Sequence, residues 1–195
     1  VAVAMCSPTA TSAALYYMVH STFAAACLFL IADLVVTRRG GDTLRAEQPT
    51  TQNGLFAALF FGAAIAMAGM PPLSGFLGKL LVLDALRAPG VIGWAWSAIL
   101  IGSLFTILGF ARAGSTLFWK STAMLPDPDM TELEDVRPPH PATALQVAPS
   151  MVALAVLGVL AAFAGPVSAY LQDTSDQLFD RAGYIAAVLE QSEDG

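Results

Sequence analysis

One lysine in the middle of an apolar stretch is the residue best placed to do chemistry in this sequence. Lys79 closes the run AGMPPLSGFLGK (68–79), and Arg87 follows eight residues later. A rise of 1.5 Å per residue puts Lys79 about 12 Å in from that polar end. A charged amine among lipid tails costs about 2.5–3.5 kcal/mol on insertion scales, so we expect it to face a hydrated interior. Burial opposes its charge and a nearby carboxylate favours it, so Lys79 can load and release a proton. The alternative is a side chain that snorkels to an interface, which the depth of Lys79 makes difficult.

A histidine within another apolar stretch is the second candidate. His20 lies in the run YYMVHST (16–22). An imidazole gains and loses a proton near neutral pH and has a nitrogen on each side, which suits a proton relay. The alternative is a neutral imidazole that bonds a carbonyl of a neighbouring helix. Hydroxyls within the apolar stretches can join such a relay or bond back to their own helices, and we expect the second; these are Ser21, Thr22, Ser103 and Thr106.

The composition is that of a membrane protein. Of the 195 residues, 56% are hydrophobic and 12% are charged, about half the charged fraction of a soluble domain. The net charge of −6 does not favour nucleic-acid binding, which needs a basic face. Cys6 and Cys27 have no metal-ligand spacing and are expected to be inert. We expect no cofactor and no metal site. Since the sequence starts at Val1 without a basic leader, we expect a piece of a longer polytopic chain.

Four apolar spans are predicted, and the second is interrupted. At 33 residues it would be about 50 Å long as one helix, against a hydrocarbon core of about 30 Å. Two half-helices joined by a break resolve this excess, and we expect them to cross together. The fold class is therefore all-α, a polytopic transmembrane bundle with one broken helix. The spans are 12–36, 54–86 (broken at 71–75), 91–111 and 147–170. The residues assigned to the break are Pro71, Pro72, Ser74, Gly75 and Gly78.

The polar segments predict a topology. Basic residues concentrate in loops 37–52 and 112–142, so the positive-inside rule places these loops in the cytoplasm and the C-terminus outside. An amphipathic surface helix is expected over 172–195, with capping-box spacing between Thr174 and Gln177. Local ion pairs are expected for Asp33 with Arg38 and for Asp84 with Arg87. The predicted organisation is a transmembrane region over 1–171, followed by this C-terminal surface helix and tail over 172–195.

Two stretches resemble a known family. The run AGMPPLSGFLGKLL (68–81), with LYYMVHSTFAAACLFLIADL (15–34), is similar to the antiporter-like subunits. These are shared by Mrp-type monovalent cation/proton antiporters and the membrane arm of NADH:quinone oxidoreductase. The D-type subunit of the Mrp antiporters is the most similar branch. The resemblance covers nearly all of the chain and corresponds to the last four helices of a fourteen-helix subunit.

The resemblance implies roles for residues and partners. Lys79 matches the terminal proton site on the family's second broken helix, and His20 matches the histidine of the preceding helix. Many complex I relatives carry a lysine shortly after that histidine, where this chain has Ala24 and Ala25; this favours the Mrp branch. The implied protein is a secondary transporter subunit rather than an enzyme, in a bacterial plasma membrane. Its partners would be other antiporter subunits, protons and a monovalent cation, with sodium expected.

Two alternatives remain open. One is an antiporter-like subunit of NADH:quinone oxidoreductase or of a membrane-bound hydrogenase, in which redox chemistry in other subunits drives the same proton path. The other is a scaffold of membrane helices that transports nothing. Flanking genes for small antiporter subunits or for quinone-oxidoreductase subunits would distinguish the two transport interpretations.

Overall fold

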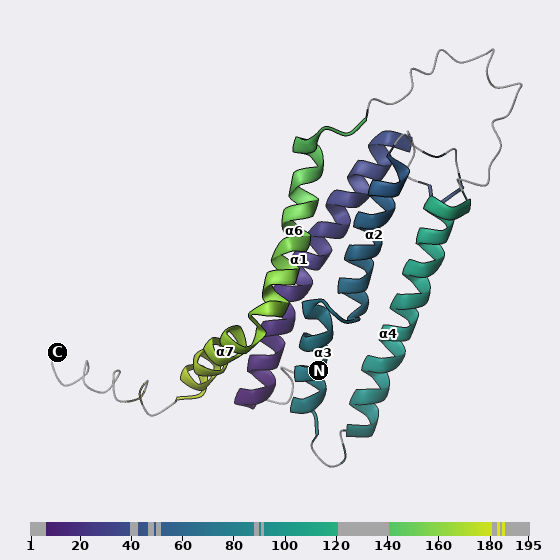
Figure 1. The fold of residues 1–195 in the computed structure, drawn as a ribbon. Helices are drawn as coiled ribbons and strands as arrows, with labels where there is room; N and C mark the ends of the chain where they lie inside the picture. Colours follow the sequence, from purple (N-terminus) through teal and green to yellow (C-terminus); the bar gives the residue numbers. More distant parts are fainter. Residues whose placement is uncertain are drawn as a thin grey trace, which may run out of the picture.

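The chain forms a bundle of helices (Figure 1). The computed structural model describes residues 7–39, 43–46, 49, 52–87, 90, 92–120, 141–180, 183 and 185. Cys6, residues 121–140 of the predicted loop 112–142, and most of residues 181–195 of the predicted surface helix fall outside these residues. The elements are α1 (Pro8–Arg39), α2 (Asn53–Ala68), α3 (Ser74–Ala85), α4 (Ile92–Gly114), the π-helical turn η2 (Ser115–Trp119), α6 (Ala144–Ala162) and α7 (Ala164–Phe179).

Helix α1 is the central element, since it packs against α2, α3, α6 and α7. Its buried residues recur every three or four positions, which is the spacing of one helix face. Apart from one histidine, this buried stripe is made of small and apolar side chains, which allow four neighbours to approach closely. The stripe includes Ala13, Tyr16, His20, Ala24, Cys27, Ile31 and Leu34.

Helices α2 and α3 follow one another across the bundle in the same direction, separated by a break (Figure 1). Gly69 ends α2 in a left-handed conformation, with φ of 70° and ψ of 43°. Its amide donates to Ala66, and the Met70 amide donates to Ile65, which is the Schellman arrangement. Pro71 and Pro72 follow, exposed between the two halves. The break therefore covers residues 69–73. The predicted break, 71–75, lies two residues too far toward the C-terminus, because α2 ends at Ala68 and Ser74 already begins α3.

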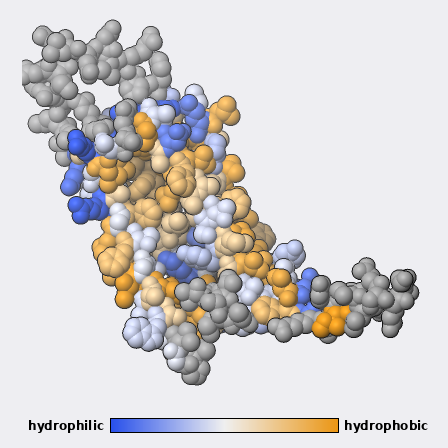
Figure 2. Space-filling view, turned by 180° about the vertical axis from the view of Figure 1, so that it is seen from behind, coloured by the Kyte–Doolittle hydropathy of each residue, from blue (hydrophilic) through white to orange (hydrophobic). Residues whose placement is uncertain are grey.

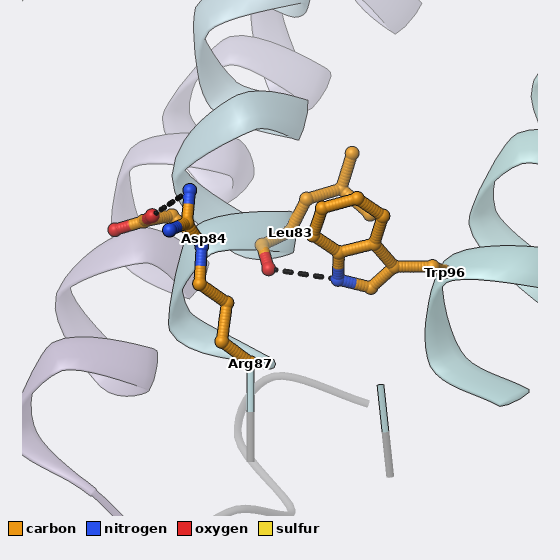
Figure 3. Close-up of polar contacts among 4 residues, drawn as sticks. All are labelled: Leu83, Asp84, Arg87 and Trp96. Carbon is orange, nitrogen blue, oxygen red and sulfur yellow. Dashed lines mark hydrogen bonds and ion pairs between the residues drawn. The ribbon is translucent and has the colours of Figure 1, made fainter. Parts of the chain in front are cut away.

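The end of α3 is tied to the start of α4 (Figure 3). Trp96 Nε1 donates to the Leu83 carbonyl at 3.0 Å, and Arg87 pairs with Asp84 at 2.8 Å, as predicted. Helix α4 continues through η2 to Trp119, well beyond the predicted end at residue 111. Within α4 only Ala95 and Gly114 are buried, and most of its other residues are exposed, including Trp94 at 85%.

The last apolar span differs from the prediction of one helix over 147–170. Helix α6 starts three residues earlier, at a capping box formed by Thr143 and Gln146, and ends before Phe163. Pro166 lacks the amide that would continue the α6 hydrogen-bond ladder, but it is tolerated in the first turn of α7. The predicted capping box at Thr174 was wrong, because Thr174 lies inside α7 and donates to the Tyr170 carbonyl.

The expected ion pair of Asp33 with Arg38 was also wrong. Arg38 instead donates to Gln146 Oε1 of α6 at 2.6 Å. Five residues along a helix amount to about 140° of rotation, so the two side chains lie on different faces. By contrast, Ser21 and Thr22 donate to the Met18 carbonyl, as predicted.

The surface is consistent with a lipid environment. Within the described residues, three helices are long and apolar enough to cross a membrane, Pro8–Arg39, Ile92–Trp119 and Ala144–Ala162, and Asn53–Ala68 is a shorter apolar helix. On the face that Figure 2 shows, apolar side chains cover most of the bundle, and hydrophilic ones gather at one end. A small hydrophilic patch interrupts this belt in the half of the bundle that holds α3.

Candidate functional site: two ionisable side chains at a helix break

The two candidate side chains converge on the C-terminal end of α2. His20 comes from α1 and Lys79 from α3, and each hydrogen-bonds the α2 backbone within three residues of Gly69. A helix end of this kind carries carbonyls without intrahelical partners and about half a negative charge. The break therefore supplies acceptors for two groups that both become cations when protonated.

Lys79 is held by two neutral oxygens. Its Nζ donates to the Ala68 carbonyl at 2.6 Å and to Ser103 Oγ of α4 at 2.8 Å. The side chain is half-buried and lines a hollow of about 710 Å³ between α1, α3 and α4. Lys79 is therefore bonded to groups of α2 and α4 at the helix break.

His20 is 1% exposed and has a partner on each side of its ring. Its Nδ1 lies 2.9 Å from Ser74 Oγ, and the ring also hydrogen-bonds the backbone of Ala66. A ring nitrogen that bonds a carbonyl must carry a proton, so in the neutral ring Nδ1 is the acceptor and the Ser74 hydroxyl donates. Protonation of Nδ1 would require the Ser74 hydroxyl to turn and accept.

Two glycines of α3 permit this close packing. A Cβ at Gly75 would lie 2.1 Å from the Ala66 carbonyl oxygen and 2.8 Å from His20 Nε2. At Gly78 it would lie 3.1 Å from the Tyr17 ring. Ser74, Gly75 and Gly78 therefore belong to the first turns of α3, where they allow α1 and α2 to approach, and only Pro71 and Pro72 of the predicted set lie in the break itself.

Two further residues of the site, Ser103 and Gly69, were not predicted from the sequence. We expected Ser103 to bond only its own helix, whereas its Oγ both donates to Ile99 and accepts from Lys79. The sequence offered one indication of this role: Ser103 carries a hydroxyl in the middle of an apolar span, on the helix that a short loop joins to α3. Gly69 was signalled by its place one residue after the apolar run, since a glycine there commonly ends a helix.

Comparison with known proteins identifies the family. Residues 1–109 match the NADH:quinone oxidoreductase/Mrp antiporter transmembrane family. The chain is 26% identical to the D-type subunit of the Na⁺/H⁺ antiporter of Bacillus subtilis (strain 168), in an alignment that covers 97% of this chain and 36% of that protein. It is 30% identical to NADH-quinone oxidoreductase subunit N 2 of Sorangium cellulosum (strain So ce56), over 77% of this chain and 29% of that protein.

A solved structure has the same fold. The Mrp complex from Dietzia sp. DQ12-45-1b aligns with a TM-score of 0.73 and 24% identity, over 94% of this chain and 40% of that chain. The chain thus spans about a third of the length of the relatives that it matches. The predicted all-α membrane fold is confirmed, as is the predicted family. This membrane-embedded chain belongs to the NADH:quinone oxidoreductase/Mrp antiporter transmembrane family.

Proposed function

We propose that this chain forms part of the proton-translocating subunit of a multisubunit monovalent cation/proton antiporter, with Lys79 and His20 as proton-carrying groups. The observation that carries the proposal is the convergence of both side chains on the broken end of α2, inside an apolar bundle. An ionisable residue within a transmembrane segment is a functional candidate by default. Irregular backbone at that depth is tolerated where it lines a cavity.

In this proposal protons move because His20 and Lys79, each a cation when protonated, interact electrostatically. Like charges in a poorly screened interior repel. A proton that arrives on one group therefore favours release from the other. Water in the hollow beside Lys79 would carry the released proton, and a change of charge at an upstream site would couple the step to cation exchange.

The immediate surroundings of His20 favour the antiporter branch. Ala24, one turn after His20, is fully buried against Ala66 and Leu157. A lysine at this position, which the resemblance implies for many complex I relatives, would have to fit among these buried side chains. The redox-driven alternative keeps the support of the similarity to NADH-quinone oxidoreductase subunit N.

The partners and the membrane orientation are part of the same proposal. The relatives named above include the D-type subunit of a Na⁺/H⁺ antiporter, which supports other antiporter subunits as partners and sodium as the cation. Arg38, Arg39 and Lys120 lie at the end where α1 and α4 finish, and Arg87 lies at the other end. Positive-inside reasoning then places loops 37–52 and 112–142 in the cytoplasm of a bacterial cell and the C-terminus outside.

A vesicle assay tests the function. The full-length protein in its assembly is placed in everted membrane vesicles, and respiration by an unrelated chain builds a pH gradient that a fluorescent dye reports. We expect added sodium or potassium chloride to discharge the gradient, and vesicles without the protein to keep it. An assembly that ignores both cations but pumps protons when given NADH and quinone would contradict the proposal and support the redox-driven alternative.

Two glycines with left-handed backbones give a matched pair of variants for the placement of Lys79. Gly69 has φ of +70° and its Cβ would lie 2.6–2.9 Å from Lys79 side-chain atoms. Gly90 has φ of +89°, and a Cβ there would meet no described atom within 4 Å. Alanine strains both backbones by about 1–2 kcal/mol. Only Gly69→Ala also pushes Lys79 from the Ala68 carbonyl, which weakens a hydrogen bond to a charged group.

We therefore expect Gly69→Ala to lower cation-dependent proton flux about tenfold, at equal amounts of assembled protein. Gly90→Ala should keep most of the flux. Equal losses in the two variants would show that backbone strain alone matters and would contradict the placement of Lys79 in the path.

A further inference from the structure

Ser103 is the residue through which α4 reaches Lys79. Its Oγ accepts from Lys79 Nζ at 2.8 Å and donates to the Ile99 carbonyl at 2.8 Å. A serine hydroxyl has one proton, and here that proton is committed to Ile99. The oxygen therefore presents only lone pairs to Lys79. A hydroxyl fixed in this way can bond an ammonium, but it cannot donate to the lone pair of a neutral amine.

The other partner of Lys79 has the same preference. The Ala68 carbonyl can only accept, so it too bonds the ammonium better than the neutral amine. The difference is that Ala68 belongs to the backbone of the helix break, whereas Ser103 is a removable side chain from a separate helix. Ser103 can therefore be changed without altering the break.

Few other ionisable groups face Lys79 from the elements around it. From α1, His20 acts on it electrostatically and Tyr17 lines the same hollow. On α3 itself, Asp84 is paired with Arg87. Helices α2 and α6, in the ranges that the structure describes, carry no Asp, Glu, Lys, Arg or His.

The basic residue of α4 is distant from Lys79. Arg112 lies nine residues beyond Ser103, about 14 Å along the helix. The described contacts of the amine are therefore with neutral oxygens, and Ser103 is one of two.

We infer that Ser103 is a positioning residue that holds Lys79 in its protonated form and thereby sets the pH at which this amine gives up its proton. The inference extends the proposed function, and it rests on that function only for its effect on transport. The bond to the hydroxyl is stronger for the ammonium than for the neutral amine, so without the hydroxyl Lys79 should release its proton at lower pH. A hydroxyl that merely helps helices to pack would leave this pH unchanged.

The test measures the protonation of Lys79 directly. Reductive methylation with formaldehyde and a mild hydride donor modifies only uncharged amines, and its small reagents can enter the hollow. The assembled complex is treated over a range of pH, and methylation at Lys79 is read by mass spectrometry. Lys120 is the other lysine of the 195-residue sequence, and it is exposed, so it serves as the internal reference in each sample.

We expect the midpoint for Lys79 to fall by about one pH unit in Ser103→Ala, which corresponds to one hydrogen bond to a charged group. Ser103→Thr keeps the hydroxyl and should keep the wild-type midpoint. Thr106→Val is the matched control, because Thr106 lies one turn further on α4 and donates to Gly102 in the same way. An unchanged midpoint in Ser103→Ala, or an equal fall in Thr106→Val, would overturn the inference.

Flux separates this inference from the proposed function. With both correct, the pH profile of cation-dependent flux in Ser103→Ala moves toward lower pH along with the methylation midpoint. If the midpoint moves while a Lys79→Ala assembly still transports normally, the inference stands and the proposed function fails. If the flux profile moves without the midpoint, Ser103 acts elsewhere and the inference is overturned.

Discussion

Replacing Lys79 with arginine should abolish cation-dependent proton flux and leave the complex assembled. Arginine keeps the positive charge and can still donate to the Ala68 carbonyl and to Ser103, which are the partners of the lysine. Its guanidinium does not lose a proton under the conditions of transport. The hollow of about 710 Å³ beside Lys79 gives the larger side chain room. The substitution therefore removes the function of Lys79 if this residue must load and release protons, and preserves it if the residue only supplies a positive charge.

The expected loss is about 100-fold or more, the usual contribution of a positioned proton-transfer group. Lys79→Ala should lose as much, and Lys120→Arg should transport normally. The measurement is the discharge of a pH gradient by added cation, with co-purification of the partner subunits as the check on assembly. Full flux in Lys79→Arg would make Lys79 a fixed charge, and full flux in Lys79→Ala would support the scaffold alternative.

Replacing Gly75 with alanine should destabilise the protein more than any other glycine substitution in the helices. The added Cβ would lie 2.1 Å from the carbonyl oxygen of Ala66, a backbone atom that already accepts from Gly69. It would also lie within 2.9 Å of the His20 ring. Because the carbonyl cannot rotate away without loss of the α2 cap, α3 must move outward and separate from α1 and α2. Overpacking of this kind costs about 3 kcal/mol.

Gly158→Ala on α6 is the control, since a Cβ there meets nothing within 4 Å. A glycine in a helix interior is less stable than alanine by about 0.5–1 kcal/mol, so this variant should be as stable as the parent or more so. The measurement is the temperature at which the detergent-purified complex loses its assembled peak in size-exclusion chromatography. Equal temperatures for the two variants would mean that α3 does not press against Ala66 as the structure has it.

The broken helix could be predicted from sequence because its causes are local. Pro71 and Pro72 cannot continue a helix, and a largely apolar stretch of 33 residues is too long for one crossing. The first and last residues of the break were harder to predict, because its start depends on Gly69 adopting φ of 70°. Gly75 was assigned to the break, but it lies in the first turn of α3 and allows close packing against Ala66 and His20.

The candidate site could be predicted only in part. Lys79 and His20 stand out because a charged or titratable side chain is costly among apolar ones. The role of Ser103 depends on how α4 is rotated about its axis relative to α3, and that rotation is set by packing between helices. The same limit explains Arg38, which bonds Gln146 of α6 rather than Asp33 of its own helix. Spacing along one helix indicates which residues share a face, but not what that face meets.

The two oxygens that accept hydrogen bonds from Lys79 are uncharged, and this has an electrical consequence. An amine paired with a carboxylate would leave a stranded anion behind each time it gave up its proton. Here, within the described residues, the oxygens that hold it belong to a peptide carbonyl and a hydroxyl, so in the proposed function the charge of Lys79 and these partners alternates between zero and one. A charge that appears and disappears inside the bilayer senses the transmembrane voltage, at about 2.3 kcal/mol per 100 mV for a full crossing. If Lys79 carries protons as proposed, its occupancy by a proton is set jointly by pH and by membrane potential.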